Sequence, residues 1–256
     1  GGIGDADQAF LIDQPEGATL VARAAEDIHI AKADGDLYVD TVFSRQDIRL
    51  EAPGSILDGS AEEEDVNLRS RSLHLDAALD IGALDDALDI GLDKPVADSP
   101  AGTGQLTAQA GRGIYLRSDH HPYTIAYAVA GAEARFTGGL ADITIDGLVQ
   151  APLGIGFSTG GLLSLGGNAR ILSDGLPIQF DGGGLRLVGG AQVDAGGADI
   201  DLMAKKGDIE IASGNGPVSL LGLTVSLLAR DDIRFAGGTL SVPGILILSA
   251  GTDGSG

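Results

Sequence analysis

Asp199-Ile200-Asp201-Leu202 and Asp208-Ile209-Glu210-Ile211 decide the fold of this chain. Each segment is an acidic residue, an aliphatic residue, a variable polar residue and another aliphatic residue. This period-two alternation is typical of a short strand with one buried face. The unit recurs at residues 27–30, 36–39, 47–50, 65–68, 113–116 (with glycine first), 142–145 and 232–235. The sequence therefore predicts a repetitive all-β protein. Its aliphatic side chains face inward, and the residues between them, His29 and Asn67 included, face outward.

A second unit, Leu-x-Ala, precedes four of these strands, at residues 20–22, 106–108, 202–204 and 227–229. Its small alanine suits a tight corner between two strands. A longer copy is also present, because residues 3–12 align with residues 81–90 and both are followed by Asp-x-Pro. The offset is 78 residues from Ile3 to Ile81, and 86 residues from Leu20 to Leu106. The sequence thus predicts strand–corner–strand units nested in a longer repeat.

From residue 136 onward the strand segments follow one another too closely for crossover helices, which leaves an antiparallel sandwich or barrel and a parallel β-helix. Hairpin turn pairs are scarce, and Asn215-Gly216 and Asp181-Gly182 come closest. This favours an all-β, parallel β-helix (solenoid) with irregular coils. Three strands per coil predict coils of about 20–25 residues, roughly eleven coils spaced ~4.8 Å apart, and a rod on the order of 50 Å long. We expect one β-solenoid segment over residues 1–256, with an irregular region at about 76–105.

The leucines and isoleucines of residues 75–92 have a spacing of three and four that also fits an amphipathic helix. Gly82 and Gly91 weaken that interpretation by about 1 kcal/mol each. The aligned residues 3–12 lack the helical pattern. One short helical turn near residues 83–88 stays open as an alternative.

Composition narrows the classes of function. Hydrophobic residues make up 43% of the chain, but aromatic residues only 4%, which predicts a narrow core of stacked small aliphatics. The formal net charge of −21 argues against binding to nucleic acid or insertion at an anionic membrane surface. The absence of cysteine excludes disulfides, thiolate catalysis and cysteine-ligated zinc. No transmembrane run or signal peptide is recognised, and we interpret the chain, which begins Gly1-Gly2-Ile3-Gly4, as a segment of a longer protein.

Residues 1–90 resemble the long repetitive exoproteins of bacteria of the filamentous-haemagglutinin type. The resemblance rests on Leu-x-Ala followed by Gly/Asp-Asp-Ile-x-Leu, and on residues 2–7 and 52–59. It covers the first 120 residues well and the remainder in repeat style only. It implies a right-handed parallel β-helix, secretion or display at the cell surface, and a role in adhesion or matrix building, with no shared catalytic residues. The implied partners are further repeats of the chain or other copies of it, and surface polysaccharide or matrix.

Two acidic segments are candidate metal sites. Residues 1–5 approach the calcium-binding pattern Gly-Gly-x-Gly-x-Asp, but Asp7 stands one place late. A turn with water-facing acids is the favoured interpretation, and weakly bound calcium is the alternative. Residues 62–65 form an acidic run, Glu-Glu-Glu-Asp, which we interpret as a solvated loop. We therefore expect no dedicated metal site and no tightly bound cofactor.

The loop at His120-His121 is a candidate transition-metal or partner site, but no third ligand follows at a typical spacing, so we expect an exposed loop. The alternative to a structural or adhesive role is a β-helix polysaccharide lyase or hydrolase. Such a site needs carboxylates converging with a cationic side chain. Its candidate members are Arg112, Arg117, Asp119 and Tyr123. Nothing in the sequence forces them to converge, so we expect no catalytic residues and no enzyme activity.

Overall fold

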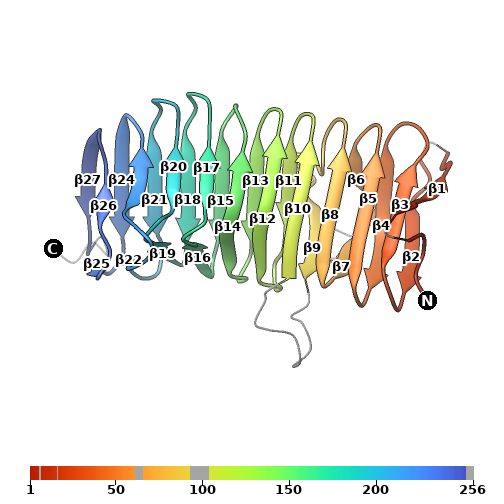
Figure 1. The fold of residues 1–256 in the computed structure, drawn as a ribbon, viewed down its shortest axis with the longest axis horizontal. Helices are drawn as coiled ribbons and strands as arrows, with labels where there is room; N and C mark the ends of the chain where they lie inside the picture. The colour runs from red at the N-terminus through yellow and green to blue at the C-terminus, as the bar shows by residue number, and fades with distance from the viewer. Residues whose placement is uncertain (6, 16, 61–65, 93–103, 252–256) are drawn as a thin grey trace.

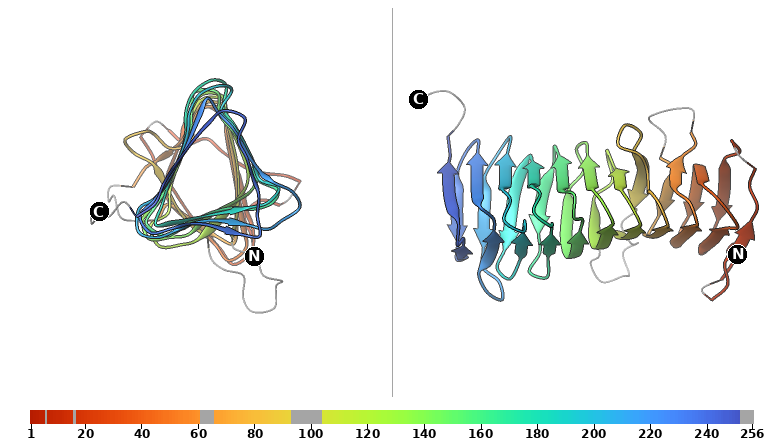
Figure 2. Two further views of the ribbon diagram at one scale, coloured as in Figure 1. Left: turned by 90° about the vertical axis from the view of Figure 1, so that its left-hand side faces the viewer. Right: turned by 90° about the horizontal axis from the view of Figure 1, so that it is seen from above.

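The protein is a parallel β-solenoid with a triangular cross-section (Figure 1; Figure 2). This computed structural model describes residues 1–5, 7–15, 17–60, 66–92 and 104–251. Within those ranges no helix is present, and the named strands pair with one another in parallel. The prediction of an all-β parallel β-helix is confirmed. Successive coils stack along the long axis from the N-terminal to the C-terminal end (Figure 1).

One sheet covers two of the three faces, which we call face 1 and face 2. Its main path consists of β1 (Phe10–Ile12), β3 (Ile28–Lys32), β5 (Asp47–Ala52), β8 (Ser72–Ala77), β10 (Gly104–Ala110), β12 (Tyr123–Ala130), β14 (Ile143–Gln150), β16 (Leu162–Leu165), β19 (Gly184–Val188), β22 (Ile209–Ala212) and β25 (Ile233–Ala236). After β14 the second face is formed by separate strands, β17 (Arg170–Leu172), β20 (Gln192–Asp194), β23 (Val218–Leu221) and β26 (Leu240–Ser241).

The other sheet forms face 3. Its strands are β2 (Leu20–Ala24), β4 (Leu37–Ser44), β7 (Leu68–Ser70), β9 (Leu88–Leu92), β11 (Ile114–Arg117), β13 (Ala134–Gly138), β15 (Ile155–Thr159), β18 (Ile178–Gly182), β21 (Ile200–Ala204), β24 (Thr224–Ala229) and β27 (Ile245–Ser249), with β6 (Ile56–Asp58) beside β4. Each coil therefore contributes one strand to face 3, or two in the coil that holds β6 and β7, and one or two strands to faces 1 and 2.

The corner between faces 1 and 2 grows along the chain. Strand β10 passes it without an extra residue, and β12 inserts Ala126 there, which shifts the register. Strand β14 inserts Asp146 and Gly147, and in the next coil residues 166–169 separate β16 from β17. A Cβ atom on Gly147 would lie 1.8 Å from the carbonyl oxygen of Ala126. A side chain at this corner would therefore force the two coils to shift.

Core side chains line up in ranks from coil to coil. Ile125, Ile145 and Leu165 are successive partners in one rank and lie 20 residues apart, in line with the predicted coil length. The coil from Leu73 to Leu106 is longer, at 33 residues. Within the irregular region predicted at 76–105, residues 93–103 lie outside the described residues.

Aromatic residues contribute more to the core than their scarcity predicts. Phe136, Phe157 and Phe180 are buried partners on β13, β15 and β18. Their rings stack with centroid separations of 5.4 and 5.2 Å and interplanar angles of 14° and 9°. The expected core of small aliphatics is thus wrong for these coils, because an in-register solenoid places like residues directly above one another.

The acidic residue that opens many repeats has a structural role. Asp142 Oδ1 accepts a hydrogen bond from the backbone N–H of Leu162 in the next coil at 2.7 Å. The same bond recurs, at 2.6–3.2 Å, where Asp27 accepts from the backbone N–H of Asp47, Asp36 from that of Ser55, Asp80 from that of Gly113, Asp199 from that of Thr224 and Asp208 from that of Asp232. We call these acceptors the coil-bridging aspartates. They satisfy backbone donors at corners where the strand ladder is interrupted.

Three local predictions are corrected. Residues 83–88 form no helical turn: Ala83 and Asp86 exchange two backbone hydrogen bonds in a tight turn before β9. Ala204 and Ala229 lie at strand ends as predicted for corners, but Ala108 lies inside β10. Asn67 does not face outward, since its side chain is fully buried.

Candidate functional site

Face 3 carries the surface with the most varied chemistry. The inward residues of its strands fill the core, and the alternate residues project outward. Their register places like positions of successive coils side by side. We call the outward residues of β11, β13, β15, β18 and β21 the face-3 track: Tyr115, Arg117, Arg135, Thr137, Gly156, Ser158, Gln179, Asp181, Asp201 and Met203.

Two shallow depressions lie next to each other on the face-3 track. The first, of about 370 Å³, lies over Gly156, with Arg135 on the coil before and Gln179 on the coil after. The second, of about 360 Å³, shares Gln179 and Asp181 with the first and continues to Met203. Both are open to solvent along the sheet surface. The surface therefore offers an elongated groove rather than an enclosed cavity.

Arg117 and Asp89 form a two-pronged ion pair at the N-terminal end of the face-3 track. The two residues are register partners on β11 and β9. The Arg117 Nε and Nη2 atoms donate to the two carboxylate oxygens of Asp89 at 2.6 and 2.5 Å. The side chain of Asp89 is almost fully buried, whereas that of Arg117 is about one-third exposed. Both residues of this ion pair are thus held in place by neighbouring strands of the solenoid.

Asn67 supports this pair from the interior, and sequence reasoning missed it. Its Oδ1 atom accepts the backbone N–H of Asp89 at 2.8 Å. Its Nδ2 atom donates to the Asp58 carboxylate at 2.7 Å and to the carbonyl oxygens of Val39 and Asp40. A fully satisfied buried amide fixes the positions of its neighbours. The sequence signal for Asn67 is weak, because asparagine there fills the third position of the four-residue repeat, which differs from copy to copy.

The titration of Asp89 reflects its surroundings. Burial raises the pKa of the Asp89 carboxyl, Arg117 opposes the rise, and the charges of Asp119 and Asp58 add to it. The bonds to Asp89 raise the pKa of the Arg117 guanidinium, so it stays charged. Because both carboxylate oxygens already accept bonds from Arg117, Asp89 is placed for structure rather than for proton transfer to a ligand.

The four residues considered for a lyase or hydrolase do not form one site. Arg117 and Asp119 are close enough to interact electrostatically. Arg112 lies at another corner, where it forms an ion pair with Asp80. Tyr123 is fully buried in the core, its hydroxyl has no hydrogen-bond partner, and burial raises the pKa of that hydroxyl. Placing Tyr123 at a surface site is therefore wrong, because it occupies a core rank beside Ile143.

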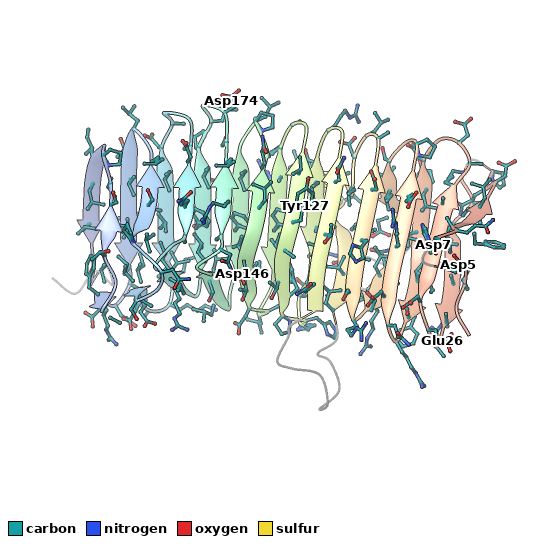
Figure 3. All side chains as sticks on the ribbon, in the orientation of Figure 1. Asp5, Asp7, Glu26, Tyr127, Asp146 and Asp174 are labelled. Carbon is teal, nitrogen blue, oxygen red and sulfur yellow. The ribbon has the colours of Figure 1, made fainter. Side chains whose placement is uncertain are left out.

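The remaining candidate ligands are dispersed. His120 is exposed and His121 is partly buried against Gly91, as expected for a loop. The Asp5 carboxylate accepts the backbone N–H groups of Asp7 and Gln8 at 3.0 and 2.7 Å, so it closes a turn at the N-terminal end of the rod (Figure 3). The acidic run 62–65 lies outside the described residues. Among the residues the structure does describe, no three His, Cys, Asp or Glu side chains gather as a metal site.

A second polar cluster lies on face 2. His29, which is buried, contacts the Asp5 carbonyl oxygen through Nδ1 at 2.7 Å and the Glu51 carboxylate through Nε2 at 3.0 Å. Arg49 also binds Glu51, at 2.7 Å. A smaller depression of about 190 Å³ follows along this face as far as Tyr127, which lies at mid-length of the rod (Figure 3). His29 occupies the outward position that alternation predicts, but its side chain is buried and both ring nitrogens contact oxygen atoms of the protein.

Comparison of the chain with protein-family models, with curated proteins and with solved structures finds no match. In the part of the chain that the structure describes, no helix is long and apolar enough to cross a membrane. The function is therefore argued from the solenoid itself and from the residues on its faces.

Proposed function

We propose that this chain is an extracellular structural or adhesive segment that forms part of a rod or filament at a bacterial surface. The resemblance of its repeats to exoproteins of the filamentous-haemagglutinin type supports this role. In that setting its partners are further repeats of the same polypeptide or other copies of it. The rod presents three faces along its length (Figure 2), and the inward residues of its strands form one hydrophobic core.

The observation that carries the proposal is that both ends of the described solenoid expose the core. Leu248 of β27 is 49% exposed, whereas Leu227, its register partner one coil earlier, is 0% exposed. Phe10 of β1 is 57% exposed at the other end, although its register partner Ile30 is buried. Strand edges at both ends also lack a neighbour within the described residues. Such edges are templates for further strands.

End-to-end continuation would bury both surfaces in register. Ile233 and Leu248 end core ranks at the C-terminal side, and Ile3 and Phe10 begin them at the N-terminal side. The two ends share one triangular cross-section (Figure 2). A further coil, from the same or another polypeptide, would therefore extend the sheets and cover the exposed apolar side chains.

Electron microscopy and scattering of the whole chain test the rod. We expect rods longer than the chain alone at high protein concentration. Leu248→Asp places a charge on the exposed core and should shorten them, whereas the matched Leu140→Asp, at a position 69% exposed on the side of the rod, should not. Short monomers at every concentration, or equal rod lengths for both variants, would contradict the proposal.

The alternative role as a polysaccharide lyase or hydrolase finds less support. Arg117 and Asp119 are the only pair of its four candidates brought together among the described residues, and Asp89 occupies the Arg117 guanidinium. Incubation with polygalacturonate and with neutral glucans separates the roles. Steady release of unsaturated or reducing ends that disappears in Asp119→Asn would favour the enzyme.

A further inference from the structure

We propose that the groove on the face-3 track binds a neutral polysaccharide chain laid along the rod axis. The inference rests on the adhesive part of the proposed function and names its ligand. The rod and the groove are tested separately, because microscopy measures the ends of the solenoid and ligand binding measures one face.

Gly156 creates the groove. It occupies an outward position in β15, where its register partners Arg135 and Gln179 carry long side chains. A Cβ atom added to Gly156 would meet only the Arg135 Cγ atom, at 3.8 Å, so the space above it is open. Its φ angle is not positive, and the backbone there does not require glycine. The missing side chain therefore leaves room for a ligand and serves no evident need of the fold.

The groove has an apolar wall and a polar floor, which match the apolar C–H face and the polar hydroxyl groups of a sugar ring. Leu153, Leu176 and Pro177, all exposed, form an apolar wall at the corner beside β15 and β18. Gln179 and Asp181 supply amide and carboxylate groups on the sheet surface. The C–H face of a pyranose ring can pack on the wall while its hydroxyls bond to the polar groups.

The geometry favours a polymer of repeating units. Neighbouring strands are spaced about 4.8 Å apart, close to the advance of one sugar along a glycan. Gln179 and Asp181 belong to both depressions, so a chain leaving the first passes directly into the second beside Asp201 and Met203. The combined length spans the coils from β13 to β24. A bound peptide is less suited to this face, because the backbone groups of these strands are already paired.

Charge decides which glycan fits. Glu133 binds the Arg135 guanidinium at 2.5 Å and neutralises the cation nearest to Gly156. Lys205 likewise pairs with Asp181 at 2.9 Å, whereas Asp201 adds negative charge, and the whole chain carries −21. A polyuronate or sulfated glycan would be repelled. A neutral chain such as a glucan or mannan can still bond through its hydroxyls to carboxylate, amide and guanidinium groups.

Affinity electrophoresis of the full chain tests the proposal, with galactomannan, xyloglucan and dextran as neutral probes and polygalacturonate as the anionic one. We expect retardation by at least one neutral probe and none by polygalacturonate. Gly156→Leu fills the groove and should weaken that retardation at least tenfold. Gly184→Leu is the matched control, because Gly184 lies in β19 on face 1, its φ is not positive, and an added Cβ would have only ordinary contacts at 3.6 and 3.7 Å.

Gln179→Ala provides a second variant that removes a polar group without adding volume, and it should weaken retardation with unchanged thermal unfolding. Wild-type protein that no neutral probe retards would overturn the proposal. So would binding by polygalacturonate alone, or retardation of folded Gly156→Leu and Gln179→Ala equal to wild type. None of these outcomes bears on the rod, whose length the end variants measure.

Discussion

The Asp142 carboxylate accepts the backbone N–H of Leu162, one coil later in the chain, at 2.7 Å. Asp142 thereby joins two coils at a corner where the sheets are interrupted. Its neighbour Ile143 starts strand β14, so a single residue type links the start of one strand to the coil above it. The acid in the Asp-Ile-x-Leu repeat is thus explained by hydrogen bonding between coils.

Replacing this acceptor should cost stability. We expect Asp142→Ala to lower the free energy of unfolding by about 1 kcal/mol, because the Leu162 N–H loses its partner at a water-exposed site. Asp174→Ala is the control, since Asp174 is exposed at another corner (Figure 3), and it should stay within about 0.5 kcal/mol of wild type. Urea titrations followed by circular dichroism give both values. Equal effects of the two substitutions would mean that the inter-coil bond contributes nothing.

The phenylalanine stack should be the part of the core most sensitive to truncation. Phe157 lies between Phe136 and Phe180, and Phe157→Ala removes both ring contacts and leaves a cavity. We expect a loss of about 3–5 kcal/mol. Phe235→Ala, at a site 53% exposed on the last strand of face 1, should cost much less. Hydrogen exchange localises the effect to the coils around β15; an equal loss for both variants would contradict this picture.

Two glycines should respond in opposite ways to alanine. Gly147→Ala drives a Cβ atom into the Ala126 carbonyl oxygen and should destabilise the protein by about 1–3 kcal/mol. Gly156→Ala meets no close atom, and it should leave stability equal to wild type or slightly higher because the unfolded chain loses freedom. Thermal unfolding distinguishes them. Comparable melting temperatures would show that the corner can relax around a methyl group.

The pH dependence of stability should have opposite signs at two ion pairs. Because the folded-state pKa of Asp89 is raised, its contribution is fully present below the unfolded pKa and is lost as pH rises through the folded pKa. The stability of wild type minus that of Asp89→Asn should therefore fall as pH rises through that range. Unfolding titrations at several pH values measure this difference. A difference that grows with pH would mean that Arg117 outweighs burial.

Asp80 supplies the opposite case. Burial favours its neutral form, but the bonds from Arg112 and from the Gly113 N–H outweigh burial and lower the pKa of Asp80. Its contribution is present above the unfolded pKa and is lost as pH falls through the folded pKa. The stability of wild type minus that of Asp80→Asn should thus rise with pH over the acidic range. The same unfolding titrations check it, and a flat profile would count against the role of the two donors.

The sequence predicts those parts of the fold that depend on alternation along one strand. The buried positions of Ile200, Leu202, Ile209 and Ile211 follow from period two alone. What depends on register between coils could not be predicted. The bond from Asp142 to Leu162 and the gap at Gly156 exist only because residues 20 or more positions apart become neighbours.

The alternation pattern also fails to predict the positions of two polar residues, Tyr123 and Asn67. Tyr123 is a candidate member of the lyase or hydrolase site, but its place in a core rank buries it. Alternation predicts an outward position for Asn67, but Asn67 lies before β7, outside the strand, where alternation no longer applies, and it is buried. The alternation of inward and outward side chains thus holds within strands but does not predict the burial of residues at corners.

The coil-bridging bonds all run in one direction. In each pair the carboxylate belongs to the earlier coil and the N–H donor to the later one, as with Asp27 and Asp47 or Asp208 and Asp232. A completed coil therefore offers acceptors that only the following coil can use. The two sides of every coil therefore differ: carboxylate acceptors lie toward the C-terminal end of the rod, and the N–H donors that they bind lie on the coil that follows.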